Sequence, residues 1–278
     1  MAVRQLRELW VHTGTTCNLS CPFCHEAASP GDLRLQAPSL TALLPHLQAA
    51  VTAGVERFAF TGGEPLIHRD IVAIVRTALQ WRPCLILTNG TAPLIKRTQH
   101  LAQWLGQPHG LSFRVSIDYP DEAQHDADRG LRNFRKALQG LRLLHEAGFA
   151  VSIARLQQPD EDARAIANRF RNLLRRQQLP EDLPVIALPP LGGLGQPTLT
   201  QALSATATSL LCQRSRMLLQ REQQLVYSPC PLVDDAPDLD MGCDLPAAWA
   251  ADVPLRHARC TVCIKQDVPY AHTEGETR

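Results

Sequence analysis

Three thiols lie close together near the start of the chain, at Cys17, Cys21 and Cys24. A loop this short can bring three sulfurs to one metal centre. A zinc site could use His25 as its fourth ligand, but adjacent cysteine and histidine ligands are awkward for one tetrahedral ion. Residues 21–25 also match the attachment pattern of a c-type haem, which would require export of the chain. A third interpretation is an iron–sulfur cluster that leaves one iron open to a further ligand.

A second set of thiols lies in the last quarter of the chain, at Cys212, Cys230, Cys243, Cys260 and Cys263. A Cys-x2-Cys pair with two distant partners can hold zinc or an iron–sulfur cluster, and the spacing does not decide between them. Thiols this dense, in a segment with little core of its own, indicate that a metal organises the segment. The remaining cysteine, Cys84, lies in an apolar run and is interpreted as a core thiol.

The elements that must position the first thiols are predicted from six short apolar runs rich in β-forming residues. These runs are Leu9–His12, Arg57–Phe60, Leu85–Leu87, Ser112–Ile117, Ala150–Ala154 and Val185–Leu188. Each is typical of a buried strand, and their separation is the length of a strand–helix unit. The sequence therefore predicts an α/β fold, a partial (β/α)6 TIM-like barrel. The cysteine loop follows the first strand, at the carboxyl end of the strands, where the active sites of such barrels lie.

Helices are expected between these strands. One is predicted around Ser39–Ala53. The clearest helical face is formed by Leu131, Phe134, Leu138, Leu141 and Leu144. Gly148 should end that helix as a C-cap glycine.

A breaker-rich connection at Pro189–Pro197 predicts a domain boundary near residue 190. Residues 1–190 would form the barrel, and residues 191–278 a small cysteine-rich C-terminal extension. Within the extension, Arg216–Gln220 and Gln224–Tyr227 predict a hairpin. Residues 234–252 contain six aspartates and no lysine or arginine.

The composition excludes several classes of function. The chain has 278 residues with 28 basic and 27 acidic side chains, a net charge of +1. This balance gives no electrostatic reason to expect nucleic acid or an anionic membrane as the main partner. No apolar run is long enough to span a bilayer, and the start lacks the apolar region of a signal peptide. We therefore expect a cytoplasmic protein, in which cysteines serve as metal ligands or catalytic groups rather than in disulfides.

The spacing Cys-x3-Cys-x2-Cys resembles the signature of the radical S-adenosylmethionine (SAM) superfamily. Four later segments of the chain are similar to motifs of that family: Thr61–Leu66, Leu87–Thr91, Ser116–Asp118 and His125–Gly130. The resemblance covers roughly residues 8–190. It implies that Cys17, Cys21 and Cys24 hold a four-iron (4Fe-4S) cluster whose open iron binds SAM. It also implies reductive cleavage of SAM to a 5′-deoxyadenosyl radical that abstracts hydrogen from a substrate.

The resemblance also assigns the contacts to SAM. It places Phe23 near the adenine, Gly62, Gly63 and Glu64 at the ammonium, Thr88 and Asn89 in a Thr-Asn-Gly turn, Ser116 and Asp118 near the ribose, and Arg129 at the carboxylate. A bidentate guanidinium suits this last task. Ordinary turns are the alternative for the glycine and asparagine motifs, since Gly-Gly and Asn-Gly turns are common on structural grounds.

The cysteines of the extension resemble the twitch and SPASM extensions of the same superfamily, which carry auxiliary four-iron clusters. A full SPASM has about seven cysteines and this segment has five, so one auxiliary cluster of the twitch type is expected. We nominate its ligands as Cys212, Cys230, Cys260 and Cys263. A structural zinc is the alternative, and Cys243 is the expected bystander.

The sequence thus predicts a radical SAM enzyme that acts on a peptide or a small molecule and takes electrons from a flavodoxin- or ferredoxin-type reductant. The short stretch before Leu6 argues against a built-in reader of a peptide leader. Residues 129–176 hold eleven basic and four acidic side chains, interpreted as a solvated helix surface rather than a docking patch. The competing hypothesis is a non-catalytic iron–sulfur or zinc protein for electron transfer or scaffolding.

Overall fold

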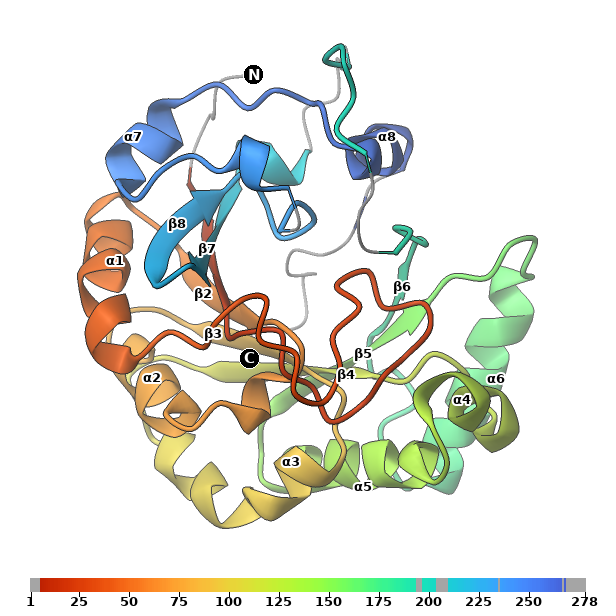
Figure 1. The fold of residues 1–278 in the computed structure, drawn as a ribbon. Helices are drawn as coiled ribbons and strands as arrows, with labels where there is room; N and C mark the ends of the chain where they lie inside the picture. Colours follow the sequence, from red (N-terminus) through yellow and green to blue (C-terminus); the bar gives the residue numbers. More distant parts are fainter. Residues whose placement is uncertain (1–5, 194–196, 204–209, 235, 267, 269–278) are drawn as a thin grey trace.

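A single curved sheet organises the chain in the computed structural model, which describes residues 6–193, 197–203, 210–234, 236–266 and 268. Its eight strands lie in the order β6-β5-β4-β3-β2-β1-β7-β8 (Figure 1). The strands are β1 Glu8–His12, β2 Arg57–Thr61, β3 Cys84–Thr88, β4 Leu111–Ser116, β5 Ala150–Leu156, β6 Val185–Leu188, β7 Ser215–Arg221 and β8 Gln224–Ser228. Strands β6 and β8 are the two ends of this order, so the barrel is open.

Strands β1 to β6 are parallel and confirm the six predicted runs, with bounds that agree within two residues. Side chains alternate between the two faces of the sheet, as the pleat requires. On the outer face, Leu9 and Phe58 belong to the core beneath the helices. On the inner face, Trp10 and Ala59 belong to a second core inside the barrel.

Most helices lie outside the curved sheet (Figure 1), whereas the last one packs against the inner core through Val262 and Ile264. The helices are α1 Leu40–Thr52, α2 Ile71–Ala78, α3 Ala92–Lys96, α4 Glu122–Arg129, α5 Asn133–Glu146, α6 Ala163–Arg176, α7 Leu245–Ala250 and α8 Ala258–Lys265. The helix expected around residues 39–53 is α1, and its N-cap Ser39 accepts a hydrogen bond from the Ala42 N–H. Cys84 is buried in the outer core, as expected of a core thiol.

The predicted face of α5 is wrong at one position. Phe134, Leu138, Leu141 and Leu144 are buried, but the side chain of Leu131 is 84% exposed and precedes the helix. The helix cannot extend back to Leu131 because the backbone between α4 and α5 turns there.

The turn before α5 begins at Gly130, whose φ is +89°, and continues through Arg132, whose φ is +65°. The Asp126 carboxylate accepts hydrogen bonds from the N–H groups of Arg132 and Phe134. It therefore caps α5 from the preceding helix. At the other end, Gly148 has a φ of +89° directly after the C-cap and ends the helix as predicted.

The predicted hairpin is confirmed as the antiparallel pair β7–β8. Strand β7 also pairs in parallel with β1, with Trp10 opposite Met217, so the hairpin extends the barrel sheet. Leu218 and Tyr227 share the outer core with the barrel helices, so this segment packs on the barrel core. The division at residue 190 stays a prediction. Residues 194–196 of the expected connection, and Asp235 of the aspartate-rich stretch, lie outside the described residues.

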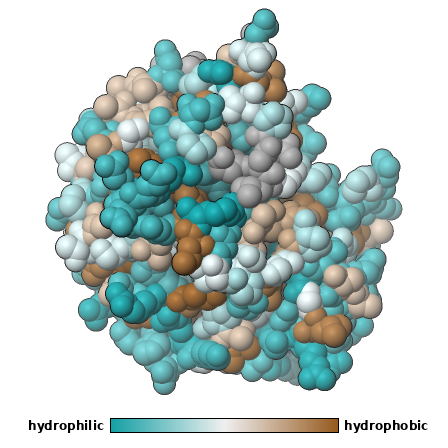
Figure 2. Space-filling view, viewed as in Figure 1, coloured by the Kyte–Doolittle hydropathy of each residue, from teal (hydrophilic) through white to brown (hydrophobic). Residues whose placement is uncertain are grey.

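Figure 2 shows a largely hydrophilic face with hydrophobic residues in small groups. Over the described ranges, the structure contains no helix that is long and apolar enough to cross a bilayer.

Candidate functional site

The first three thiols lie in the loop between β1 and α1, at the carboxyl edge of the parallel strands. The Cys17 N–H donates to the Ser29 carbonyl at 3.1 Å, which closes the base of the loop. The Cys24 N–H donates to the Cys21 carbonyl at 3.1 Å, so these two thiols share a tight turn. Cys17, Cys21 and Cys24 line one pocket. The loop therefore presents all three sulfurs to the same cavity.

Burial controls the protonation of these thiols. It raises the pKa of Cys17 to about 12, and the nearby Glu64 carboxylate adds to the rise. Burial also raises the pKa values of Cys21 and Cys24. A metal ligand must be a thiolate, so metal binding here would release protons.

The two glycines after β2 are required by a close approach of backbones. A Cβ atom at Gly63 would lie 2.5 Å from the Thr16 carbonyl oxygen, and Gly62 has a φ of +132°. The Gly63 N–H donates to the Gly14 carbonyl at 2.9 Å. The turn therefore supports the cysteine loop directly, which an ordinary Gly-Gly turn would not need to do.

Glu64 is held in place by three donors. Its carboxylate accepts hydrogen bonds from the Leu66 N–H (3.0 Å), the Thr88 hydroxyl (2.8 Å) and the Asn89 N–H (2.7 Å). Burial raises its pKa to about 6, and these hydrogen bonds oppose the rise. The three donors favour the carboxylate form and fix the side chain in the wall of the pocket that contains Cys17.

The turn after β3 is tied to the cysteine loop. The Asn89 amide donates to the Asn18 side-chain oxygen at 3.0 Å, and the Asn18 amide donates to the Thr91 hydroxyl at 2.9 Å. Thr88 and Asn89 both line the pocket, but their side chains also position Glu64 and the loop. The sequence analysis missed Asn18 and Thr91. The place of Asn18 directly after Cys17 was the available signal.

Asp118 and Arg129 form a pair. The Asp118 carboxylate accepts a hydrogen bond from Arg129 Nε and a second, at 2.9 Å, from the Leu156 N–H. Burial opposes the charge on Arg129, but Asp118 together with the Cys21 and Cys24 thiols more than offsets it, so the pKa of the guanidinium is raised. The guanidinium carbon lies 5.3 Å from the centre of the Phe23 ring, a cation–π contact. Among the described residues only Nε of this guanidinium has a hydrogen-bond partner, which leaves the two Nη atoms for a ligand.

The structure brings every predicted residue of the barrel site to one pocket. Its wall includes Cys17, Cys21, Phe23, Cys24, Gly62, Gly63, Glu64, Thr88, Asn89, Ser116, Asp118 and Arg129. The apolar side of the wall is formed by residues from β5, β6 and the segment after them: Ala154, Leu156, Leu188, Pro189 and Leu191.

The four nominated thiols of the extension line a second pocket with apolar walls. Cys212 precedes β7, Cys230 follows β8, and Cys260 and Cys263 lie on α8. Burial raises the pKa of Cys212 to about 12, and the neighbouring Cys260 and Cys263 thiols add to the rise. Cys243 is exposed and lies elsewhere, in a groove that it lines with residues of α1, β7 and β8.

Arg216 holds the two ends of the hairpin next to these thiols. Its buried guanidinium donates to the carbonyls of Cys212 (2.6 Å) and Pro229 (3.3 Å). Burial lowers the pKa of Arg216 to about 10, and the Cys212 and Cys230 thiols oppose the fall. A cation is thus placed beside a group of potential thiolates.

The sulfurs of the two thiol sets can be compared with the ligands of a single zinc ion. Within the described part of the chain, no three thiol sulfurs lie with every pair inside 4.8 Å. Tetrahedral zinc, with Zn–S bonds of about 2.3 Å, would bring its thiolates to about 3.8 Å of one another. Among the described thiols, no three sulfurs are therefore already arranged as ligands of one zinc ion.

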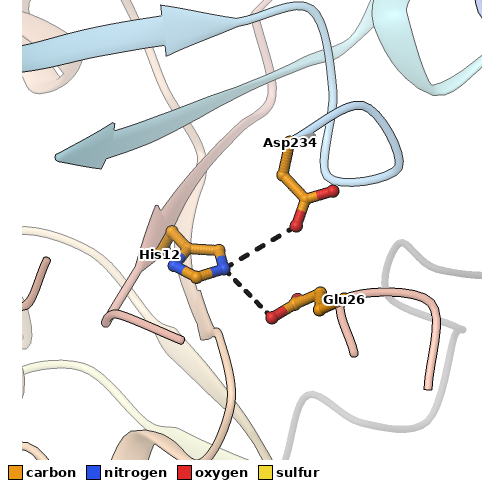
Figure 3. Close-up of side chains that lie close together, drawn as sticks. All are labelled: His12, Glu26 and Asp234. Carbon is orange, nitrogen blue, oxygen red and sulfur yellow. Dashed lines mark hydrogen bonds and ion pairs between the residues drawn. The ribbon is translucent and has the colours of Figure 1, made fainter. Parts of the chain in front are cut away.

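A buried polar cluster lies next to the cysteine loop, and the sequence analysis missed it. Figure 3 shows that the carboxylates of Glu26 and Asp234 both point at Nε2 of His12. The distances are 3.1 Å to Glu26 and 3.7 Å to Asp234. These residues are far apart in the sequence, so no local spacing could have joined them.

The fold and the pocket define a partial α/β barrel with a three-thiol loop at the carboxyl ends of its strands. A family profile described as the Radical SAM superfamily matches residues 11–169. The chain belongs to the radical SAM superfamily of enzymes.

Curated relatives carry two different names. The chain is 30% identical over 274 residues to the GTP 3′,8-cyclase of Mycobacterium marinum (strain ATCC BAA-535 / M), covering 94% of this chain and 71% of that one. It is 31% identical over 145 residues to the AdoMet-dependent heme synthase of Nitratidesulfovibrio vulgaris Hildenborough, covering 50% and 37%. A probable GTP 3′,8-cyclase of Methanopyrus kandleri matches over only 28% of its own length.

A solved structure confirms the fold. Streptococcus suis SuiB bound to S-adenosylmethionine superposes with a TM-score of 0.68 at 13% identity, over 91% of this chain and 68% of that one. At this identity the likeness concerns the architecture alone.

Proposed function

We propose that the barrel pocket binds a four-iron cluster on Cys17, Cys21 and Cys24 together with SAM. When bound, these groups would supply a 5′-deoxyadenosyl radical that abstracts hydrogen from a peptide or small-molecule substrate, leaving 5′-deoxyadenosine. The observation that carries this proposal is the convergence of three thiols, a fixed carboxylate and an arginine on one pocket.

The residues around the pocket suit the parts of SAM. The anionic Glu64 offers a carboxylate to the SAM ammonium, and Leu66, Thr88 and Asn89 prevent it from turning away. Asp118 holds the Arg129 guanidinium by Nε, so that its Nη atoms can meet the SAM carboxylate. Phe23, stacked on that guanidinium, offers an apolar surface to the adenine. Ser116 lies in the same wall near the expected ribose.

We propose an auxiliary four-iron cluster on Cys212, Cys230, Cys260 and Cys263. Their convergence on one apolar pocket supports it. The buried Arg216 beside two of the thiols also suits an anionic centre. Cys243 has no place in this site.

The charges in the pocket favour a substrate other than a nucleoside triphosphate. The two guanidinium groups in the described wall are already engaged, Arg129 with Asp118 and with the SAM carboxylate that we assign to it, and Arg155 with Glu161. Glu26 and Glu64 add negative charge to the same wall. A triphosphate would need several uncompensated cations. The apolar side formed by β5 and β6 suits a neutral part of a peptide or small molecule instead.

Proteins similar to this chain provide two observations about the substrate class. Another structure of SuiB is bound to the precursor peptide SuiA, and its fold matches this chain with a TM-score of 0.55. The curated relatives are named for GTP and for haem, so the names of related proteins do not agree on one class. A peptide and a small molecule both remain in the proposal.

Electrons would come from a flavodoxin- or ferredoxin-type reductant. All nine cysteines are free thiols. Free thiols are typical of a reducing compartment, so we propose a cytoplasmic location.

Anaerobic reconstitution with iron and sulfide, followed by SAM and dithionite, tests the proposal. A radical SAM enzyme forms 5′-deoxyadenosine, whereas a non-catalytic iron–sulfur or zinc protein forms none. Adding GTP to the same mixture should neither change the rate of formation nor give a modified nucleotide. A GTP-dependent product would contradict the proposed substrate class and leave the SAM chemistry intact.

A further inference from the structure

A buried polar network connects the two cysteine sites. It consists of His12 at the end of β1, Glu26 beside the first cysteines, Asp234 after the hairpin, and Arg259 on α8. All four side chains are nearly inaccessible, at 0%, 3%, 3% and 1% exposure. His12 contacts both carboxylates (Figure 3), and Arg259 Nη1 lies 3.4 Å from Asp234 Oδ1. The chain of contacts therefore runs from the barrel loop to the extension without reaching solvent.

Arg259 makes the most connections in this network. Its Nη2 donates to the carbonyls of His25 (2.8 Å) and Gly193 (2.9 Å). Its Nη1 donates to the Leu232 carbonyl (2.9 Å), and its Nε donates to the Leu191 carbonyl (3.3 Å). One guanidinium thus joins the cysteine loop, the segment after β6, the segment after β8, and α8.

The position of Arg259 places it directly between the two thiol sets. His25 follows Cys24 in the chain, and Arg259 precedes Cys260. A single hydrogen bond, from Arg259 to the His25 carbonyl, therefore joins the residue next to Cys260 to the residue next to Cys24.

The cluster of His12, Glu26 and Asp234 has the residue types of a metal site, but its hydrogen bonds argue otherwise. The Gly14 N–H donates to Nδ1 of His12 at 3.1 Å, so Nδ1 carries no proton. The proton of a neutral imidazole is then on Nε2, the atom that faces both carboxylates. That nitrogen is a hydrogen-bond donor to Glu26 and has no lone pair for a metal.

Buried charges seldom add net stability compared with apolar side chains of similar size, but they do favour one geometry. Leucine in place of Arg259 could fill the volume, but it could not bind the four carbonyls from three other segments. We infer that Arg259, with Asp234, His12 and Glu26, is a positioning residue. It fixes the barrel cysteine loop relative to the auxiliary thiols, which are Cys212, Cys230, Cys260 and Cys263. This inference rests on the proposed function, because it takes the two thiol sets as cluster sites.

Hydrogen exchange on the reconstituted holoprotein tests this role. Arg259→Lys keeps the charge but loses the guanidinium fork. It should speed exchange of the loop amides of Cys24 and Ala27, which donate to the Cys21 and Cys24 carbonyls, by at least about tenfold. Arg256→Lys is the matched control, since Arg256 is on the same segment and donates to the Leu199 carbonyl within the extension. Wild-type exchange of the loop in Arg259→Lys would overturn the inference.

A spectroscopic readout separates positioning from a local effect on α8. In a Cys260→Ala/Cys263→Ala background, the EPR spectrum of the reduced protein with SAM reports on the barrel cluster alone. Adding Arg259→Lys should change that spectrum, and adding Arg256→Lys should not. An unchanged spectrum would mean that Arg259 stabilises only α8 and does not position the barrel cluster.

Glu26→Gln tests the network from its other end and applies even if Arg259→Lys does not fold. It should speed exchange of the amides of Cys260 in α8 and of Gln266 at its C-cap, which donate to the His257 and Val262 carbonyls. Unchanged exchange in α8 would contradict the coupling, because coupling between two sites is reciprocal. Failure of the proposed function would instead appear as wild-type protein that forms no 5′-deoxyadenosine, whatever the exchange result.

Discussion

At the scale of single residues, the site depends on side chains that other side chains hold still. Glu64 has three donors, and Arg129 is held by Asp118 on one edge and Phe23 on one face. A ligand entering this pocket meets groups that need little rearrangement, which lowers the cost of binding.

Glu64→Gln should weaken SAM binding while the iron content of the barrel site persists. A charge-assisted hydrogen bond contributes roughly 1.5–3 kcal/mol, so the expected loss of affinity is on the order of ten- to a hundredfold. Calorimetry of SAM binding to the reconstituted protein measures it. Glu56→Gln, on the surface before β2, is the control and should bind SAM normally. Equal affinity of Glu64→Gln and wild type would return the turn at residues 62–64 to a purely structural role.

The sequence predicted the residues of this pocket but not the contacts among them. The motifs are local, so Cys17, Glu64 and Arg129 could each be found by spacing. The pairing of Asp118 with Arg129 joins two motifs and was not foreseen. Arg259 and Asp234 had no motif, because their roles arise only when segments more than 200 residues apart along the chain meet.

At the scale of elements, local patterns predicted the strands and the hairpin because each is defined by contiguous residues. The prediction for Leu131 was wrong because Asp126 of the preceding helix caps α5 after that residue. The spacing of apolar residues gives no sign of such a cap. The parallel pairing of β7 with β1 was not predicted, since no pattern within either strand specifies a partner so distant in sequence.

The junction of α4 and α5 should limit stability in acid. His125 is buried with its ring 5.5 Å from that of Phe134. Burial, followed by the charge of Arg129, lowers its pKa to about 4. The unfolded chain binds the proton below about pH 6.5 and the folded protein does not, so stability falls as the pH falls from 6.5 to 4. The contribution is about 3 kcal/mol over that range.

His125→Phe removes this titration and keeps an aromatic ring. Its free energy of unfolding should therefore fall less between pH 7 and pH 4.5 than that of the wild type. Denaturant unfolding at the two pH values measures the difference. Parallel losses in the two proteins would show that His125 does not contribute to the acid sensitivity.

At the scale of the whole molecule, the extension and the barrel share one sheet and one outer core. The auxiliary thiols are therefore fixed with respect to the barrel pocket by β-sheet pairing as well as by Arg259. A metal site built in this way would be an integral part of the enzyme.

Iron and zinc analysis tests the auxiliary site. Reconstituted wild type should contain about eight irons, and Cys260→Ala/Cys263→Ala about four, given one four-iron cluster at each site. Cys243→Ala is the matched control and should keep about eight. Four irons and one zinc in the wild type would show a structural zinc site, and loss of irons in Cys243→Ala would show that the ligands were chosen wrongly.

The central claim is that three loop thiolates hold the cluster that cleaves SAM. The most direct test is the rate of 5′-deoxyadenosine formation by reconstituted Cys17→Ala, Cys21→Ala and Cys24→Ala, each compared with Cys243→Ala. Each loop variant lacks one of the three thiolates that leave a single iron open, so each should form no 5′-deoxyadenosine. Cys243→Ala should match the wild type. Formation at the wild-type rate by any loop variant would contradict the assignment of the barrel site.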